Sequence, residues 1–260
     1  MTRFAALCWL LSGCEVYFVA PTVWSYIKSL GQTKLFLAFV VSAFNVGAVI
    51  AGSAAGFLID RFGKPRFIFL SSCVTKVFAY SVYSVNLSAY FPLFGMLVSG
   101  LGEMGIATIL GQIALQPDKE SRAKNFVFMD GAFCLGAAFG PAIGSLLTFQ
   151  ENILGWQINE GNSPGIVLAI IWLLFLVLSI LLPEAIWIAP GACNVELTSD
   201  DEANQSNKKQ RLSKHIPETT PCNVLKDMRI ISLLFIIFSS EAFSSTSTFY
   251  VPVLALDHFH

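Results

Sequence analysis

The sequence predicts an all-α membrane protein, and its composition and apolar patterning carry that prediction. Of the 260 residues, 55% are hydrophobic and only 13% are charged, whereas soluble domains carry about a quarter charged residues. The apolar residues gather in windows of about 20 residues, the length that a helix needs to cross a bilayer. Polar segments separate these windows, so the chain reads as a series of membrane-spanning helices.

Seven windows qualify as spans, and we expect helices over 4–27, 35–59, 67–85, 91–115, 126–148, 165–182 and 230–255. The segment 183–229 is long and polar, and its part 195–222 has the composition of a flexible linker. The predicted organisation is therefore a six-helix unit over 1–182, a linker over 183–229 and one more helix within 230–260.

The basic residues predict the orientation of the spans. With a cytoplasmic N-terminus, all of the 16 Lys and Arg residues are cytoplasmic except Lys28, Lys34 and Lys76. This bias follows the positive-inside rule and makes the linker cytoplasmic. The same topology puts Asn86, in the sequon Asn86-Leu87-Ser88, on the opposite side, so Asn86 is the expected glycosylation site.

The most specific motif joins spans two and three, and its key residues are Gly56, Asp60, Arg61, Gly63, Lys64 and Arg66. We expect Gly56 to let the helix end approach its neighbour and Gly63 to allow a tight turn. The plain alternative is an ordinary cytoplasmic loop with positive charges. The spacing resembles, at every fixed position, the loop 2–3 signature of the major facilitator superfamily, G-x-L-x-D-R-x-G-R/K-x-R/K.

This resemblance implies a fold and an activity. Superfamily carriers have about twelve helices in two halves of inverted three-helix repeats, and one half rocks against the other. The chain would be the six-helix N-terminal half plus helix seven, and the loop charges would form a cytoplasmic latch. We therefore expect a secondary transporter of a small solute, present here as a fragment or short isoform. The alternatives are a channel-like anion conductance and a non-transporting half-protein that pairs with a full carrier.

Span five carries a second motif, with glycines at every fourth position and a proline: Gly136, Gly140, Pro141 and Gly144. Such glycines form a smooth helix face for close packing, and the proline permits a bend. The string resembles the fifth-helix signature of superfamily antiporters, with Ser145 replacing the last glycine. In span four, Gly100 and Gly102 resemble the end of the R-x-x-x-G-x-G motif, but Met96 stands in place of its arginine, which weakens a proton-antiport prediction.

Ionisable residues within the spans are costly in hydrocarbon and therefore indicate function or pairing. They are Glu15 in span one, Lys76 in span three, Glu103 in span four and Glu241 in span seven. The resemblance implies that helices one, four and seven line the central cavity, so the three glutamates are the predicted substrate or proton pathway. The alternative is a structural ion pair of Lys76 with Glu15 or Glu103. Asn45 and Asp130 are weaker pathway candidates.

Other function classes lack sequence support. The chain has no nucleophile motif, phosphate-binding loop or metal-ligand spacing, and its three histidines lie outside the spans. We expect no enzyme activity, catalytic residue, metal or cofactor. The expected partners are the lipid bilayer and a small-molecule substrate, with no nucleic acid.

Three short strings add a finer resemblance, within the superfamily, to the branch called major facilitator superfamily domain-containing protein 8. They are Gly100-Leu101-Gly102, Gln157-Ile158-Asn159 and Phe238-Ser239-Ser240-Glu241. This resemblance implies a lysosomal or other endomembrane location for the multi-pass protein, with the plasma membrane as the alternative.

Overall fold

The computed structural model describes residues 2–116, 118–153 and 156–183. All of them belong to the first of two units of the chain, Met1–Ala192. The predicted linker, the predicted seventh span and Glu241 lie outside the described residues.

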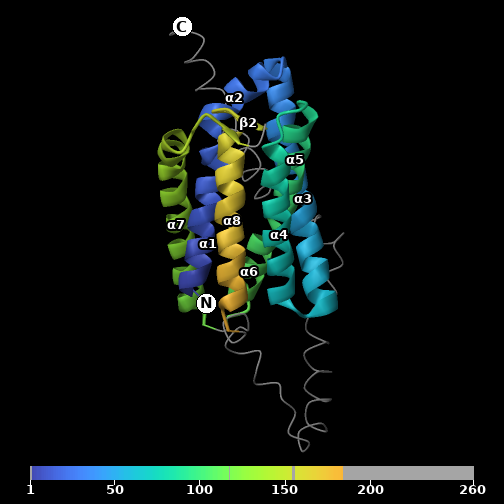
Figure 1. The fold of residues 1–260 in the computed structure, drawn as a ribbon. Helices are drawn as coiled ribbons and strands as arrows, with labels where there is room; N and C mark the ends of the chain where they lie inside the picture. Colours follow the sequence, from blue (N-terminus) through green and yellow to red (C-terminus); the bar gives the residue numbers. More distant parts are fainter. Residues whose placement is uncertain (1, 117, 154–155, 184–260) are drawn as a thin grey trace, which may run out of the picture. The chain divides into compact units, whose positions relative to one another are not determined.

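The described unit is helical apart from one short hairpin (Figure 1). Its elements are α1 (Thr2–Phe18), α2 (Ala20–Ser29), α3 (Lys34–Phe62), α4 (Pro65–Tyr83), α5 (Tyr90–Leu101), α6 (Met104–Ala114), α7 (Lys119–Leu146), β1 (Glu151–Ile153), β2 (Trp156–Ile158) and α8 (Ser163–Leu181). In the described part, 5 helical segments are long and apolar enough to cross a membrane: Thr2–Ser29, Lys34–Ile59, Tyr90–Ala114, Lys119–Leu146 and Ser163–Leu181. The protein is therefore an all-α, multi-pass membrane protein.

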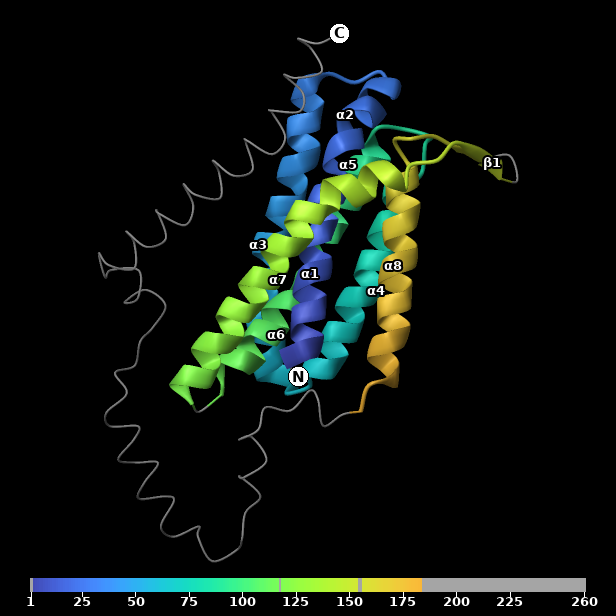
Figure 2. The ribbon, with the colours of Figure 1, turned by 90° about the vertical axis from the view of Figure 1, so that its left-hand side faces the viewer.

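Helix α4, the predicted third span, is not one of these 5 segments. Its 19 residues give a length of about 28 Å, enough for the hydrocarbon core. It carries Lys76 and several hydroxyl side chains, which lower its apolar character, yet it packs among the other helices (Figure 2). The N-terminus lies at the same end as the α3–α4 and α6–α7 connections, while α2 and the hairpin lie at the opposite end.

Two of the predicted spans are interrupted. The first is divided between α1 and α2 at Val19, two residues before Pro21, which lacks the amide hydrogen that would continue the helical hydrogen-bonding pattern. The fourth is divided between α5 and α6 at Gly102 and Glu103. At the second break, backbone hydrogen bonds such as that from the Glu103 amide to the Gly100 carbonyl, at 3.0 Å, replace the regular helical pattern, because backbone polar groups at membrane depth need partners within the protein.

The loop predicted over 149–164 contains a two-stranded antiparallel hairpin. Glu151 pairs with Ile158, and Asn152 pairs with Gln157. Each strand has 3 residues, too few for a periodic pattern to be readable in the sequence. The side chain of Asn162 accepts a hydrogen bond from the Asn159 amide at 2.7 Å, which fixes the return of the chain into α8.

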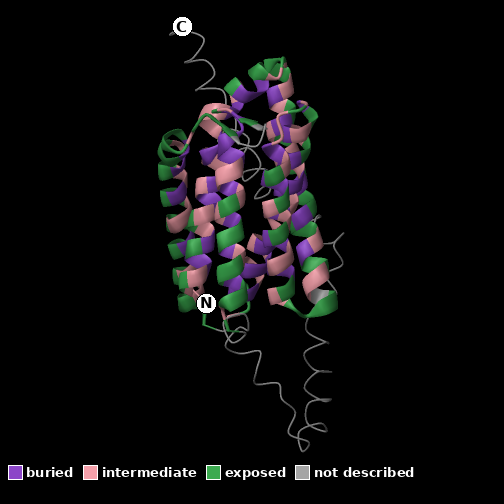
Figure 3. Ribbon diagram, viewed as in Figure 1, coloured by how far each residue is buried: buried purple, intermediate pink, exposed green. Residues whose placement is uncertain are grey.

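The helices differ in how much of their surface is covered. In the apolar stretches of α3 and α7, 22% and 17% of residues are buried, against 44% in the α1–α2 and α5–α6 spans. Exposed positions recur along the length of the helices in Figure 3, and large apolar side chains such as Val49 and Phe139 occupy them. An apolar exterior of this kind suits hydrocarbon or another apolar helix.

Candidate functional site

The connection between α3 and α4 is a tight turn built on Gly63. This glycine has φ +59° and its amide donates to the Ile59 carbonyl at 2.9 Å, which ends α3 with a left-handed cap. Pro65 then begins α4. The expectation for Gly56 is wrong within the described residues, because a Cβ added there meets nothing within 4 Å. Among the described residues, no helix comes close to α3 at Gly56.

The basic residues of this connection differ in their surroundings. Arg66 donates from Nη2 to the Ile180 carbonyl at 2.9 Å, so it joins the start of α4 to the last turn of α8. A guanidinium at the C-terminal end of a helix also interacts favourably with the helix dipole. Arg61 and Lys64 are exposed, and Asp60 lies in the last turn of α3.

The glycine motif of α7 faces the backbone of α1. A Cβ added at Gly136 would approach the Cys14 amide nitrogen to 2.8 Å, and one at Gly140 would lie 2.9 Å from the Cys14 carbonyl. Gly144 meets the Phe18 carbonyl in the same way. Pro141 lies inside the helix, on the turn between the last two glycines. The motif therefore brings two spans together at backbone distance.

At the centre of the unit, the Nζ atom of Lys76 lies 2.5 Å from Oε1 of Glu15 and 2.5 Å from Oε1 of Glu103. The Glu15 and Lys76 side chains are each 1% exposed, and the Glu103 side chain is 18% exposed. Helices α1 and α4 and the break between α5 and α6 thus meet through one ammonium group. Such charges are stable in a membrane interior only when they are paired.

Two hydroxyl groups complete the surroundings of Glu15. Tyr80 donates its hydroxyl to Oε1 of Glu15, and Ser99 donates to the same oxygen at 3.0 Å. The other carboxylate oxygen, Oε2, is buried and has no hydrogen-bond partner among the described residues. We refer to Glu15, Lys76, Tyr80, Ser99 and Glu103 as the central cluster.

Aromatic rings and a glycine shape the space around Lys76. Its Nζ lies 5.7 Å from the ring centre of Phe44 in α3 and 5.2 Å from that of Trp172 in α8, within the range of a cation–π attraction. A Cβ added at Gly102 would lie 2.6 Å from Cγ of Lys76. Gly102 therefore leaves room for the aliphatic stem of the lysine.

The helix break beside the cluster has its own polar partner. The Ser72 hydroxyl donates to the carbonyl of Gly102, which also accepts a hydrogen bond from the Gly105 amide at 3.4 Å. Ser72 is on the same face of α4 as Lys76 and Tyr80, one and two turns away. This spacing of four residues was the signal in the sequence that could have predicted the supporting side chains.

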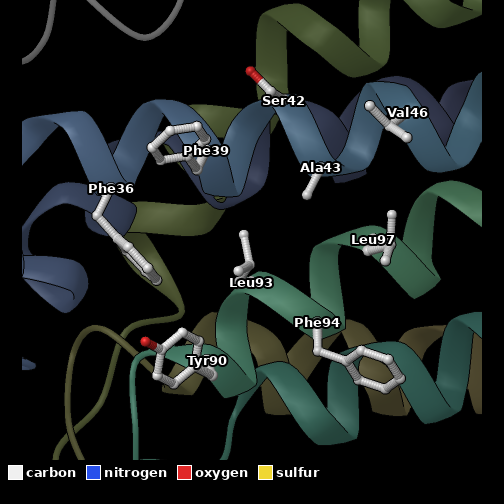
Figure 4. A pocket seen from close by; sticks show the side chains of 9 residues that line it. All are labelled: Phe36, Phe39, Ser42, Ala43, Val46, Tyr90, Leu93, Phe94 and Leu97. Atoms are coloured by element: carbon white, nitrogen blue, oxygen red, sulfur yellow. The ribbon is translucent and has the colours of Figure 1, made fainter.

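A separate groove of about 610 Å³ lies between α3 and α5 (Figure 4). Ala43 of α3 and Leu93 of α5 point toward one another across it. Apart from the hydroxyls of Ser42 and Tyr90, its lining is apolar, and none of its lining residues is charged. The groove and the central cluster are therefore chemically distinct.

Comparisons with known proteins decide the family. A family model described as Major Facilitator Superfamily matches residues 5–260. The chain belongs to the major facilitator superfamily. This membership also supports the prediction that the chain is not an enzyme.

Relatives within the superfamily are distant and longer. The quinolone resistance protein NorA of Staphylococcus aureus is 27% identical over 130 residues, 50% of this chain and 33% of NorA. An uncharacterized transporter of Methanocaldococcus jannaschii is 27% identical over 143 residues, 53% of this chain and 36% of its own. The matched part of the chain thus spans about a third of each relative's length.

A solved structure shows the same fold. The crystal structure of a D-xylose-proton symporter superposes with a TM-score of 0.60 and 20% identity, covering 82% of this chain and 52% of the symporter. The described helices α1 to α8 therefore have the arrangement found within a major facilitator.

The remaining predicted residues lie apart from the central cluster. Asn45 is exposed on α3, and Asp130 is exposed on α7. Asn86 is half-buried in the connection between α4 and α5, at the end of the unit opposite the N-terminus. Among residues 2–116, 118–153 and 156–183, no group of three or more His, Cys, Asp and Glu side chains could hold a metal ion.

Proposed function

We propose that the protein is a secondary transporter of a small solute and that the central cluster is its coupling site. The observation that carries this proposal is the ammonium of Lys76 held between two carboxylates, 2.5 Å from each, in the middle of the membrane-spanning unit. The stability of the fold does not require an ion pair at this position, because well-packed apolar residues stabilise a buried site at least as well as an ion pair does. Intramembrane charges of this kind mark solute or proton pathways.

The roles of the two described carboxylates differ in this proposal. Glu103 is partly exposed and is the member that a solute or proton can reach, whereas Glu15 is sealed and holds Lys76. Glu241 of the predicted seventh span, which lies outside the described residues, stays a candidate for the pathway. Asn45 is a candidate on the exposed face of α3.

An antiport mechanism is the finer proposal. The glycine face of α7 and Pro141 support it through their resemblance to the antiporter motif, and the name of NorA, a quinolone resistance protein, suggests export. Met96, buried where the superfamily motif has arginine, speaks against simple proton antiport.

Alternating access further requires a second half. We propose that this half is provided by residues beyond the described unit or by a partner chain, with the charged α3–α4 connection as the latch between halves. A lone chain without flux that transports after co-purification with a partner would favour the half-protein alternative.

Flux through proteoliposomes tests the proposal. Vesicles holding the full chain and a pH-sensitive dye are challenged with a fluorescent quinolone, the compound class in the name of the relative. We expect saturable uptake, which Glu15→Gln and Glu103→Gln each impair while the exposed hairpin variant Glu151→Gln does not, and the dye shows whether protons move with the solute. Unchanged flux in both cluster variants would contradict the coupling site, and a non-saturating anion current would favour a channel.

The location is proposed on resemblance. The three short strings that resemble the major facilitator superfamily domain-containing protein 8 branch favour a lysosomal membrane. A fluorescently tagged full chain should then coincide with a lysosomal marker in cells, and signal confined to the plasma membrane would contradict this address.

A further inference from the structure

We infer that the central cluster selects cations. A positively charged solute binds the Glu103 carboxylate there by replacing the ammonium of Lys76. The inference deepens the proposed transport function and rests on it for the route by which solute arrives. It names the substrate class, which neither the family nor the relatives assign to this chain.

The first observation is which charges are accessible at membrane depth. Away from the helix ends, the charged side chains of the described spans are Glu15, Lys76, Glu103 and Asp130. The single cation, Lys76, is 1% exposed, whereas Glu103 is 18% exposed and Asp130 is exposed. At the central cluster, an approaching solute therefore meets the Glu103 carboxylate and not the ammonium. In a site of low dielectric this favours a cation and repels an anion.

The second observation is that Lys76 can leave Glu103 without losing its counter-charge. It is paired at the same 2.5 Å distance with Glu15. Glu15 is held in place by the hydroxyls of Tyr80 and Ser99. Because an unpaired charge is the costly state in a buried site, an exchange on Glu103 that leaves the Lys76–Glu15 pair intact avoids the main penalty.

The third observation concerns the backbone at Glu103. This residue is the N-cap of α6, directly after the break at Gly102, and is not in the middle of a continuous helix. The rings of Phe44 and Trp172 lie 5.7 and 5.2 Å from the ammonium of Lys76, which is also the group that Glu15 binds. The fixed part of the arrangement is thus around Lys76 and Glu15, and Glu103 is the part that can exchange partners.

A pair of probes with matched shape and opposite charge tests the selectivity. Tetraphenylphosphonium and tetraphenylborate are offered to the purified full chain in nanodiscs, and binding is measured by equilibrium dialysis against empty nanodiscs. We expect saturable binding of the phosphonium and none of the borate. Glu103→Gln should weaken phosphonium binding by roughly tenfold or more, since it removes the Coulomb attraction of the accessible carboxylate, and each tenfold corresponds to about 1.4 kcal/mol. The control Glu151→Gln removes an exposed acid of the hairpin and should bind as the wild type.

A second variant removes Lys76, which competes with the solute, and keeps the Glu103 carboxylate to which the solute binds. The double variant Glu15→Gln with Lys76→Met deletes one positive and one negative charge and leaves Glu103 free. It should bind the phosphonium several-fold more tightly than the wild type, because Lys76 no longer competes. Weaker or equal binding in the double variant would overturn the exchange, and saturable borate binding would overturn the selectivity.

These outcomes separate the inference from the proposed function. Phosphonium binding that depends on Glu103, without flux in proteoliposomes, contradicts transport by this chain and leaves the cation site standing. Saturable flux together with equal binding of both probes contradicts cation selectivity and leaves transport standing.

Discussion

The Nζ atom of Lys76 in α4 lies 2.5 Å from Oε1 of Glu15 in α1, and both side chains are 1% exposed. The two residues are 61 positions apart in the chain, so the pair fixes two spans to one another at the same depth. Glu103 shares the ammonium at an equal distance but keeps 18% of its side chain exposed. The Lys76–Glu15 pair is thus the buried part of the cluster, and Glu103 is the part that solvent or a solute can reach.

Removing the shared ammonium should destabilise the protein strongly. Lys76→Met leaves Glu15 buried without a counter-charge, and breaking a buried pair in this way costs about 3–5 kcal/mol. The double variant with Glu15→Gln should recover a large part of this loss. Chemical unfolding of the detergent-solubilised full chain measures both values.

A matched exposed pair provides the control for this experiment. Lys124 lies 2.7 Å from Glu120 with side chains 74% and 77% exposed. Lys124→Met should cost about 0.3–0.5 kcal/mol, as expected for an exposed helical pair. Equal losses in Lys76→Met and Lys124→Met would show that the central pair is not buried as described.

The glycine face of α7 gives a second prediction, with a control in the same helix. Gly136→Ala puts a methyl group 2.8 Å from the Cys14 amide nitrogen, and overpacking of this kind costs about 1–3 kcal/mol. At Gly131 a Cβ meets nothing within 4 Å, so Gly131→Ala should be neutral or stabilising by up to about 1 kcal/mol. Thermal unfolding in detergent compares the two, and equal stabilities would argue against close α1–α7 packing.

The space beside Lys76 gives a third prediction. Gly102→Ala would place a methyl group 2.6 Å from Cγ of the lysine, so the aliphatic stem of Lys76 must shift from the path that now holds its ammonium between Glu15 and Glu103. We expect loss of stability and altered phosphonium binding. Gly111→Ala is the control, because its Cβ meets only Ile59 Cδ1 at 4.0 Å. Wild-type behaviour of Gly102→Ala in both assays would show that the stem of Lys76 does not need this space.

Two glycines of the α3–α4 connection should respond differently to alanine. Gly63 has φ +59°, and an L-residue in this region costs roughly 1–2 kcal/mol. Gly56→Ala meets no neighbour within 4 Å and should be tolerated by the described unit. Reduced stability of Gly63→Ala with unchanged Gly56→Ala is the expected result from thermal unfolding, and the reverse order would contradict the turn geometry.

Much of the helical fold could be predicted from the sequence because apolar windows and short polar connections determine it. The six predicted spans within residues 4–182 correspond to the helices from α1 to α8. The break at Gly102 could not be predicted, because its stabilising partner, Ser72, lies on another helix. The hairpin was missed because its strands are too short to show alternation.

The charged residues of the central cluster could be predicted from the sequence, but their contacts could not. Ionisable residues in hydrocarbon are conspicuous, so Glu15, Lys76 and Glu103 stood out. Their contact within 2.5 Å depends on the relative rotation of α1, α4 and α5, which packing decides. The same rotation determined that Gly56 faces open space while Gly136 faces α1. Small residues show that a close contact can form, but the sequence does not show which of them make one.

The start of α7 gives a prediction that depends on pH. Asp118 caps this helix by accepting hydrogen bonds from the hydroxyl of Ser121 at 2.5 Å, from its amide at 3.0 Å and from the Glu120 amide at 3.3 Å. These bonds favour the ionised carboxylate and hold the pKa of Asp118 below its usual value of 3.8. Because the folded-state pKa is lowered, the cap stabilises the helix start above the unfolded-state pKa, and this stabilisation is lost as the pH falls through the folded-state value.

Amide hydrogen exchange of Glu120 and Ser121 in the full chain tests this cap. At neutral pH, Asp118→Ala should speed their exchange relative to the wild type, because both amides lose their acceptor. Asp118→Asn should retain most of the protection, since asparagine is also a good N-cap and needs no charge. As the pH falls through the lowered pKa, the advantage of aspartate over asparagine should disappear. Identical exchange in Asp118→Ala and the wild type at neutral pH would contradict the cap, and protection that depends on pH in Asp118→Asn would show that another group titrates there.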